Sequence, residues 1–225
     1  MSINNPNNDS NQNDKSTALS PFHHGEQELQ TRAGKRERME NFGRKTVRTF
    51  MPDQHREFYS QLPFLIMGSV DNHGWPWASI IPGKAGFIQS TTPTELNTRR
   101  RNRVNGQVSK LNKGGVTFKV GQSFGNCPQY IQHRSINYIH DIGKVGPNYE
   151  KHSFTNLDEM SSSLIKNADT FFVSSFIPAK NRPEMEGVDV SHRGGRPGFV
   201  KIEGNILTVP DYPGNNLFNT LGNFL

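Results

Sequence analysis

The chain has 225 residues, a formal net charge of +6, one cysteine and a hydrophobic fraction of only 32%. Its length is sufficient for one large domain or two small ones, and the single cysteine, Cys127, excludes an intramolecular disulfide. No apolar run approaches the roughly 20 residues that cross a bilayer, so we expect a cytoplasmic protein. The positive charge favours an anionic partner, either nucleic acid or a phosphorylated small molecule.

Residues 1–21 form an Asn-rich tail with hardly any apolar side chain, and we expect this tail to be disordered. Residues 22–60 are expected to form an N-terminal helical segment. Within it, residues 32–48 have the pattern of a basic, weakly amphipathic helix whose apolar positions are Met39, Phe42 and Val47. Such a helix is most simply a solvated helix on the edge of a domain.

From residue 61 the pattern changes to short apolar runs separated by Gly, Pro and Asn, which is typical of strands in an antiparallel barrel or sandwich. We therefore predict a mainly β protein with a few helices. Turns are expected at 71–74 and 112–115, where Asn and Gly tolerate positive φ. The strands of this first unit, residues 61–133, are predicted at 63–70, 74–81, 85–90, 103–111 and 114–124.

Residues 97–106 contain the densest group of arginines. In an extended strand Arg99, Arg101 and Arg103 project to one face and can present three guanidinium groups to phosphate. The alternative is a charged edge strand that discourages aggregation. Nucleic-acid binding is the less favoured function because aromatic residues are not regularly interleaved with the arginines.

Residues 134–166 are predicted to be a linker followed by a helix, which Thr155 or Asn156 would cap. Residues 167–225 then form a second unit that repeats part of the first. The apolar strand FLIMGSV is followed by GKAGFI at 83–88, and FFVSSFI is followed by GRPGFV at 195–200. Two copies of one β unit explain this similarity, and chance resemblance of two β-rich stretches is the alternative.

The stretch SHRGGRPGFV at 191–200 combines features that suit an anion. Gly194 and Gly195 allow the backbone to approach a ligand closely, and Arg193 and Arg196 carry planar, permanently charged groups suited to phosphate. A hairpin turn with exposed arginines is the alternative. His192 alone does not indicate a metal, and because none of the eight histidines has a recognised ligand spacing, we expect no metal site.

Several stretches together resemble the pyridoxamine 5'-phosphate oxidase-related flavin-nucleotide-binding proteins. The resemblance runs from about residue 22 to the end of the chain, and its most specific motifs are SFGNCPQYIQ and SHRGGRPGFV. The other matching stretches are HHGEQELQTRAGKRERMENFGRKTVRTFMPDQHREFYSQLPFLIMGSVDNHGWPWAS, NTRRRNRVNGQV, ADTFFVSS and DYPGNNLFNTLGNFL. This similarity implies a split β-barrel, duplicated within the chain, that binds FMN noncovalently, together with pairing of two barrels in a homodimer and a nicotinamide or other electron donor.

The resemblance also implies roles for particular residues. Arg193 and Arg196 would hold the FMN phosphate, with Ser191 or His192 as a hydrogen-bonding neighbour in the turn that continues through Gly194, Gly195 and Pro197. Asn219, Thr220 and Asn223 would lie at a helix start that faces the cofactor. Trp75 and Trp77 would flank a planar ring or fill the core, and core filling is the simpler expectation. No catalytic residue can be named.

The sequence departs from the family pattern in two places. A helix and a strand are missing between AGFIQS and RRRNRVNG, and the second unit ends at NTLGNFL, so both barrels are expected to be incomplete. The predicted function is an FMN-binding flavoprotein of the oxidoreductase type. The alternatives are a non-catalytic flavin-binding or relic protein and a basic nucleic-acid-binding module.

Overall fold

A computed structural model gives the fold of most of the chain after the N-terminal tail. The residues that it describes are 19–90, 101–112, 115–126, 129–132, 134, 136–139, 141–142, 152–178 and 187–225. The predicted tail therefore lies almost wholly outside the described residues, as do Cys127 and Arg99.

The described residues form five helices and eight strands. The helices are α1 (His24–Arg32), α2 (Arg36–Thr46), α3 (Asp53–Ser60), α4 (Glu159–Asn167) and α5 (Asn219–Gly222). The strands are β1 (Phe64–Val70), β2 (Pro76–Pro82), β3 (Arg101–Asn112), β4 (Gly115–Asn126), β5 (Thr170–Ile177), β6 (Gly187–Gly194), β7 (Lys201–Glu203) and β8 (Ile206–Thr208).

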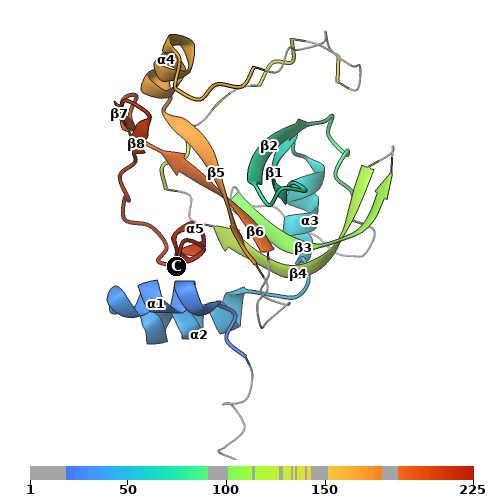
Figure 1. Ribbon diagram of the computed structural model, residues 1–225. Coiled ribbons are helices and arrows are strands. Elements are labelled where there is room, and N and C mark those ends of the chain that lie inside the picture. The colour runs from blue at the N-terminus through green and yellow to red at the C-terminus, as the bar shows by residue number, and fades with distance from the viewer. Residues whose placement is uncertain are drawn as a thin grey trace, which may run out of the picture.

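The strands pair in sequence order as β1–β2, β3–β4, β5–β6 and β7–β8, and each pair is antiparallel. The β1–β2 hairpin packs on the β5–β6 hairpin, and the long β3–β4 hairpin curves beneath them (Figure 1). Two register shifts, at Asn105/Gly106 and Val108/Lys110, interrupt the β3–β4 ladder. The combination of antiparallel strands with a few helices agrees with the prediction, but within the described residues the strands remain four separate pairs rather than a closed barrel.

Three helices lie in the predicted helical segment, and the helix expected at 32–48 is present but shorter, as α2 over Arg36–Thr46. α1 ends at Arg32, and Gly34, with φ at 65°, turns the chain before α2 begins. A left-handed residue cannot continue a helix, which explains the break. Met39 is buried on α2 while Phe42 is 44% exposed, so only part of the predicted apolar face contacts the protein.

The strand at 85–90 is also a wrong prediction. Gly86 has φ at 88°, and its N–H donates to the Ser60 carbonyl at 2.6 Å, which draws this segment back to the end of α3. Arg56 of α3 then donates to the Ser90 side chain at 2.6 Å and to the Ser90 carbonyl at 2.9 Å. Contacts with a helix therefore replace the strand pairing that the apolar pattern predicts.

The two predicted units repeat the same local structure. In the first, a turn from Lys84 to Phe87 is closed by a hydrogen bond of 3.0 Å from the Phe87 N–H to the Lys84 carbonyl. In the second, the turn from Arg196 to Phe199 is closed in the same way, also at 3.0 Å. The third residue of each turn is a glycine with positive φ, at 88° in Gly86 and 84° in Gly198. This conformation is the one that type II turns require.

The residue just before each turn also makes an equivalent backbone hydrogen bond. The N–H of Gly83 donates to the Pro63 carbonyl at 3.0 Å, and the N–H of Gly195 donates to the Asp169 carbonyl at 2.9 Å. Pro63 and Asp169 immediately precede the first strand of their hairpins, β1 and β5. The internal similarity in the sequence thus corresponds to two hairpins of the same construction.

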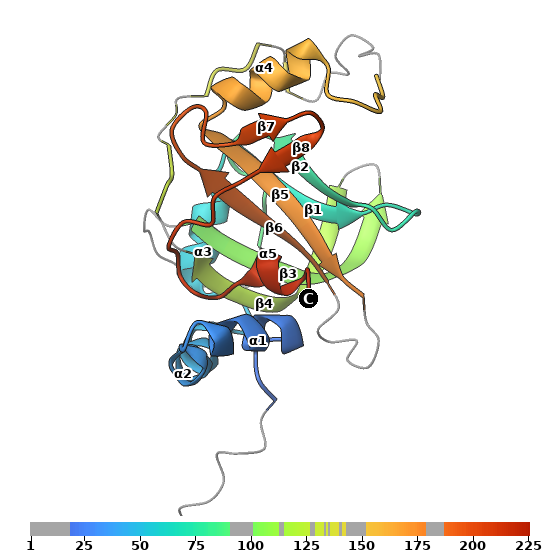
Figure 2. The same cartoon turned by 60° about the vertical axis from the view of Figure 1, so that its left-hand side comes forward.

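The main cluster of buried apolar side chains lies where the N-terminal helices, β4 and the C-terminal segment meet (Figure 2). Its members are Phe22, Met39, Phe124 and Leu217, with Val47 packed against them. The chain after β8 runs back past β6 and ends at α5, which lies against α1. Because the C-terminal segment folds back in this way, α5 lies between α1 and strand β6 and contacts both of them.

Helix α4 is capped by neither of the two predicted residues. The Asp158 carboxylate accepts a hydrogen bond of 2.8 Å from the Ser161 N–H, which makes Asp158 the N-cap. Aspartate satisfies a free N–H group at a helix start and its charge is favourable there.

Candidate functional site

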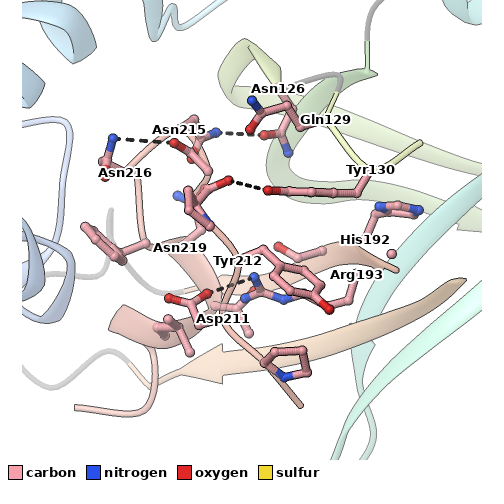
Figure 3. Close-up of a pocket in the computed structure, with 18 of the residues that line it drawn as sticks. Asn126, Gln129, Tyr130, His192, Arg193, Asp211, Tyr212, Asn215, Asn216 and Asn219 are labelled. Atoms are coloured by element: carbon pink, nitrogen blue, oxygen red, sulfur yellow. Dashed lines mark hydrogen bonds and ion pairs between the residues drawn. The ribbon is translucent and has the colours of Figure 1, made fainter. Parts of the chain in front are cut away.

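A polar pocket of about 270 Å³ lies between the end of β4, β6 and the C-terminal segment (Figure 3). Its walls come mainly from three stretches that are far apart in the sequence, and Arg103 of β3 also lines it. Asn126, Gln129 and Tyr130 come from SFGNCPQYIQ, the second wall belongs to SHRGGRPGFV, and the third belongs to DYPGNNLFNTLGNFL. The pocket is therefore built from the motifs that carry the sequence resemblance.

Six of the predicted site residues line this pocket: Ser191, His192, Arg193, Gly194, Asn219 and Thr220. The last two are the first residues of α5, as predicted. His192 also packs its ring edge-to-face against Phe172, with the ring centroids 5.6 Å apart. The backbone passes very close at Gly194, because a Cβ atom there would be 2.3 Å from the Tyr130 carbonyl oxygen. Any larger residue at this position would displace that wall of the pocket.

The remaining predicted residues do not line the pocket. Gly195 lies just beyond β6, and Arg196 and Pro197 belong to the exposed turn that follows it. Asn223 follows α5 and donates from Nδ2 to the Ser175 hydroxyl at 2.9 Å. Of the two arginines proposed to hold a phosphate, only Arg193 is at this site.

Arg193 faces an acidic residue across the pocket. One of its guanidinium nitrogens is 3.6 Å from a carboxylate oxygen of Asp211, and the side chains are 28% and 56% exposed, respectively. This separation is longer than a hydrogen bond. Exposed ion pairs contribute little to stability, so the guanidinium can be used for a ligand at small energetic cost.

Beneath the pocket lies a buried charged pair, Arg103 of β3 and Asp189 of β6. The Arg103 guanidinium also donates to the Val190 carbonyl at 3.0 Å and to the Ser191 hydroxyl at 2.9 Å, and it lies over the Phe124 ring. A buried charge is tolerated only with such complete pairing. The Arg103 charge is therefore already paired within the protein, and this pairing holds β6 against β3.

A second buried carboxyl group anchors the other wall. Glu26 of α1 is 5% exposed; its Oε1 accepts a hydrogen bond of 2.5 Å from Asn219 Nδ2, and its Oε2 accepts one of 2.9 Å from the His23 N–H. Burial raises the pKa of Glu26 to about 7, and these hydrogen bonds only partly oppose the shift. The position of Asn219 in the pocket thus depends on a residue near the start of the chain.

Carboxamide and phenol groups dominate the outer part of the pocket. Asn215 donates to Asn126 at 2.9 Å, and the Tyr130 hydroxyl donates to the Pro213 carbonyl at 3.1 Å. The rings of Tyr130 and Tyr212 lie 5.3 Å apart. The other carboxamides of the lining are Gln129, Asn216 and Asn219. Carboxamides donate and accept hydrogen bonds, so this part of the pocket suits hydroxyl groups.

The tryptophans of the first unit lie elsewhere. Trp75 is 68% exposed and Trp77 is 51% exposed, and neither lines the pocket. The expectation that they fill the core is wrong. Trp77 instead donates from Nε1 to the Asp71 carboxylate at 2.8 Å, which also accepts from the N–H groups of His73 and Trp75 at 2.9 Å and so organises the β1–β2 turn.

The first unit has no residue equivalent to Arg193, the guanidinium of SHRGGRPGFV that lines the pocket. When the two hairpins are matched through their registers, Ser191 corresponds to Ser79 and Arg193 corresponds to Ile81. The guanidinium at this position is thus specific to the second unit.

Sequence reasoning did not single out Asp189, Glu26 or Asp211. For Asp189 a signal was present, since it is an acidic residue within the apolar strand sequence GVDV. For Glu26 and Asp211 the sequence offers no comparable signal, because both lie in polar surroundings.

The chain matches no protein-family model, no curated protein and no solved structure. Within the described part of the chain, no helix is long and apolar enough to cross a membrane. The same residues contain no group of three or more His, Cys, Asp or Glu side chains that could hold a metal ion.

Proposed function

We propose that the chain is an FMN-binding flavoprotein of the oxidoreductase type and that the pocket beside Arg193 holds the phosphate end of the nucleotide. The observation that supports this proposal is that three separate stretches, whose sequences resemble those of flavin-nucleotide-binding proteins, meet at one polar pocket.

The residues present fit a phosphate group. Arg193 supplies a planar, permanently charged guanidinium group whose N–H donors suit phosphate oxygens. Asp211 opposes an anion, but its 56% exposure means that water screens its charge.

The residues also fit the hydroxyl chain that joins the phosphate of FMN to its ring. Carboxamides such as Asn126, Asn215 and Asn219 supply both donors and acceptors for such hydroxyls. The volume of about 270 Å³ is close to the lower limit of roughly 300 Å³ for small-molecule pockets, so it matches part of the nucleotide. When bound, the flavin supplies the electron or hydride chemistry, while the protein binds and orients it.

The test compares FMN with riboflavin, which lacks the phosphate, in fluorescence titrations of the wild type and two variants. If Arg193 holds the phosphate, Arg193→Ala weakens FMN binding by about 10- to 100-fold, the range for a charge-assisted hydrogen bond. Riboflavin affinity changes little in this variant, so the preference for FMN disappears. Arg196→Ala is the matched control, because Arg196 is exposed and outside the pocket, and it retains FMN binding within about twofold.

Two results would contradict the proposal. One is a wild-type protein that binds neither FMN nor riboflavin. The other is an equal loss of FMN binding in the two arginine variants, which would indicate a general charge effect rather than a phosphate site.

FMN binding does not by itself make the protein an enzyme, so oxidoreductase activity is tested in a separate measurement. Reduction of the bound flavin by NADH or NADPH, followed by repeated turnover with an electron acceptor, supports an enzyme. Flavin binding without turnover would identify a non-catalytic flavin-binding protein instead.

A further inference from the structure

A second, apolar pocket of about 170 Å³ adjoins the polar one. The two pockets share Arg193, Pro210, Asp211, Thr220 and Leu221. The walls that belong only to the second are Phe171, Val173, Val209 and Phe224. All four are apolar, and they come from β5, from the segment after β8 and from the end of the chain.

The size and lining of this pocket suit a single six-membered ring. An apolar protein cavity of about 150 Å³ lined by aliphatic and aromatic side chains binds benzene. The apolar pocket has a similar volume but is partly open to solvent, because Phe224 is 64% exposed and Val209 is 38% exposed. The rings of Phe171 and Phe224 are among its walls. Aromatic rings at contact distance attract one another beyond simple burial.

The charged rim limits the chemistry of the ligand. Arg193 can donate a hydrogen bond and Asp211 can accept one, and their charged groups are 3.6 Å apart (Figure 3). Both residues line both pockets. A hydroxyl group can accept from the guanidinium and donate to the carboxylate at the same time. A ring without a polar group would leave both rim residues unused, whereas a hydroxyl group can pair with both of them.

We propose that the apolar pocket is a binding site for a monocyclic phenol, with the ring between Phe171, Val173, Val209 and Phe224 and the hydroxyl at Arg193 and Asp211. This site goes beyond the proposed flavin binding and does not require it.

The test uses 4-fluorophenol as the probe and follows its fluorine NMR signal during titration with protein to which no flavin has been added. Val209 lines only the apolar pocket and is 38% exposed, so Val209→Trp fills the pocket without disturbing buried structure. Leu207→Trp is the matched control, because Leu207 is 46% exposed two residues earlier and lines neither pocket. We expect saturable binding in the wild type and the control, and at least a tenfold loss in Val209→Trp.

A further variant, Asp211→Asn, tests the hydroxyl contact. It should weaken 4-fluorophenol severalfold and leave fluorobenzene unchanged, whereas FMN binding should become tighter because a negative charge is removed from beside the phosphate. The proposal is overturned if the wild type shows no saturable signal, if both tryptophan variants bind equally, or if Asp211→Asn affects fluorobenzene and 4-fluorophenol alike. Failure of FMN to bind would refute the flavin proposal alone.

Discussion

Glu26 connects the N-terminal helix to the wall of the polar pocket through Asn219, and burial raises its pKa to about 7. The groups that face it are His23, Asn219, Asp189 and Arg103. Burial also lowers the pKa of His23. Folding therefore favours the uncharged form of both side chains, and each of them makes the stability of the protein depend on pH.

The effects of Glu26 and His23 on stability have opposite signs. The pKa of Glu26 is raised from 4.5, so the folded state holds this proton more tightly and the free energy of unfolding falls as pH rises from about 4.5 to 7. The pKa of His23 is lowered from 6.5, so its contribution is complete above pH 6.5 and is lost as pH falls through the lowered pKa.

Glu26→Gln should remove the loss of stability between pH 4.5 and 7, which for this shift is on the order of 3 kcal/mol. Chemical denaturation at a series of pH values measures the effect as the difference between the wild-type and variant curves. Glu28→Gln, at an exposed position of the same helix, is the control and should leave the pH dependence unchanged. Parallel wild-type and Glu26→Gln curves over this range would show that Glu26 titrates normally.

At the scale of elements, the contact between α1 and α5 depends on two glycines. A Cβ atom at Gly25 would be 2.0 Å from the Gly222 carbonyl oxygen, and one at Gly222 would be 2.7 Å from the Glu26 nitrogen. Both close approaches involve backbone atoms, which cannot move without separating the helices. This contact holds the C-terminal segment in place as a wall of both pockets.

Gly25→Ala should therefore destabilise the protein although it improves the intrinsic helix propensity of α1. Alanine in a helix is favourable by about 1 kcal/mol relative to glycine, but overpacking typically costs about 1–3 kcal/mol, and here the obstacle is rigid backbone. Gly125→Ala in β4 is the control, because a Cβ atom there meets nothing within 4 Å. Equal or greater stability of Gly25→Ala in urea unfolding would mean that the two helices do not make this contact in solution.

At the scale of the whole molecule, one face of the outer β3–β4 hairpin is apolar and exposed. Val108 pairs with Phe118 and Leu111 pairs with Val116, so these four side chains lie on a common face. Their exposed fractions range from 38% to 77%. An apolar face of this kind is characteristic of an interaction surface, and we propose that it contributes to the homodimer expected from the sequence resemblance.

Phe118→Glu should shift the protein from dimer to monomer in sedimentation velocity, because a charge at the centre of an apolar interface would be buried without a partner. Lys119→Glu, at the next position and on the opposite face of β4, should leave the dimer intact. A wild-type protein that is monomeric at all concentrations would exclude a homodimer, and a Phe118→Glu dimer would place the interface elsewhere.

The sequence by itself determined features that depend on neighbouring residues. The β1–β2 hairpin, the turn at Asp71 and the repeated turn around Gly86 and Gly198 follow from short apolar runs and from glycine at positions of positive φ. Strand β6 does not, because Ser191–Gly194 were expected to form a turn but lie in this strand. The start of α5 and the glycine at position 194 were also readable, and six of the ten predicted site residues line the polar pocket.

Only the tertiary structure decided which charged and aromatic groups meet. Arg103 and Asp189 are 86 residues apart, and Glu26 and Asn219 are 193 residues apart, so no local pattern could pair them or show that Arg103 is already bound. Residues 85–90 have strand-like composition but turn back to α3, and the tryptophans have core-like composition but remain exposed. Propensity acts over a few residues, whereas burial and charge pairing depend on where the whole chain brings its segments together.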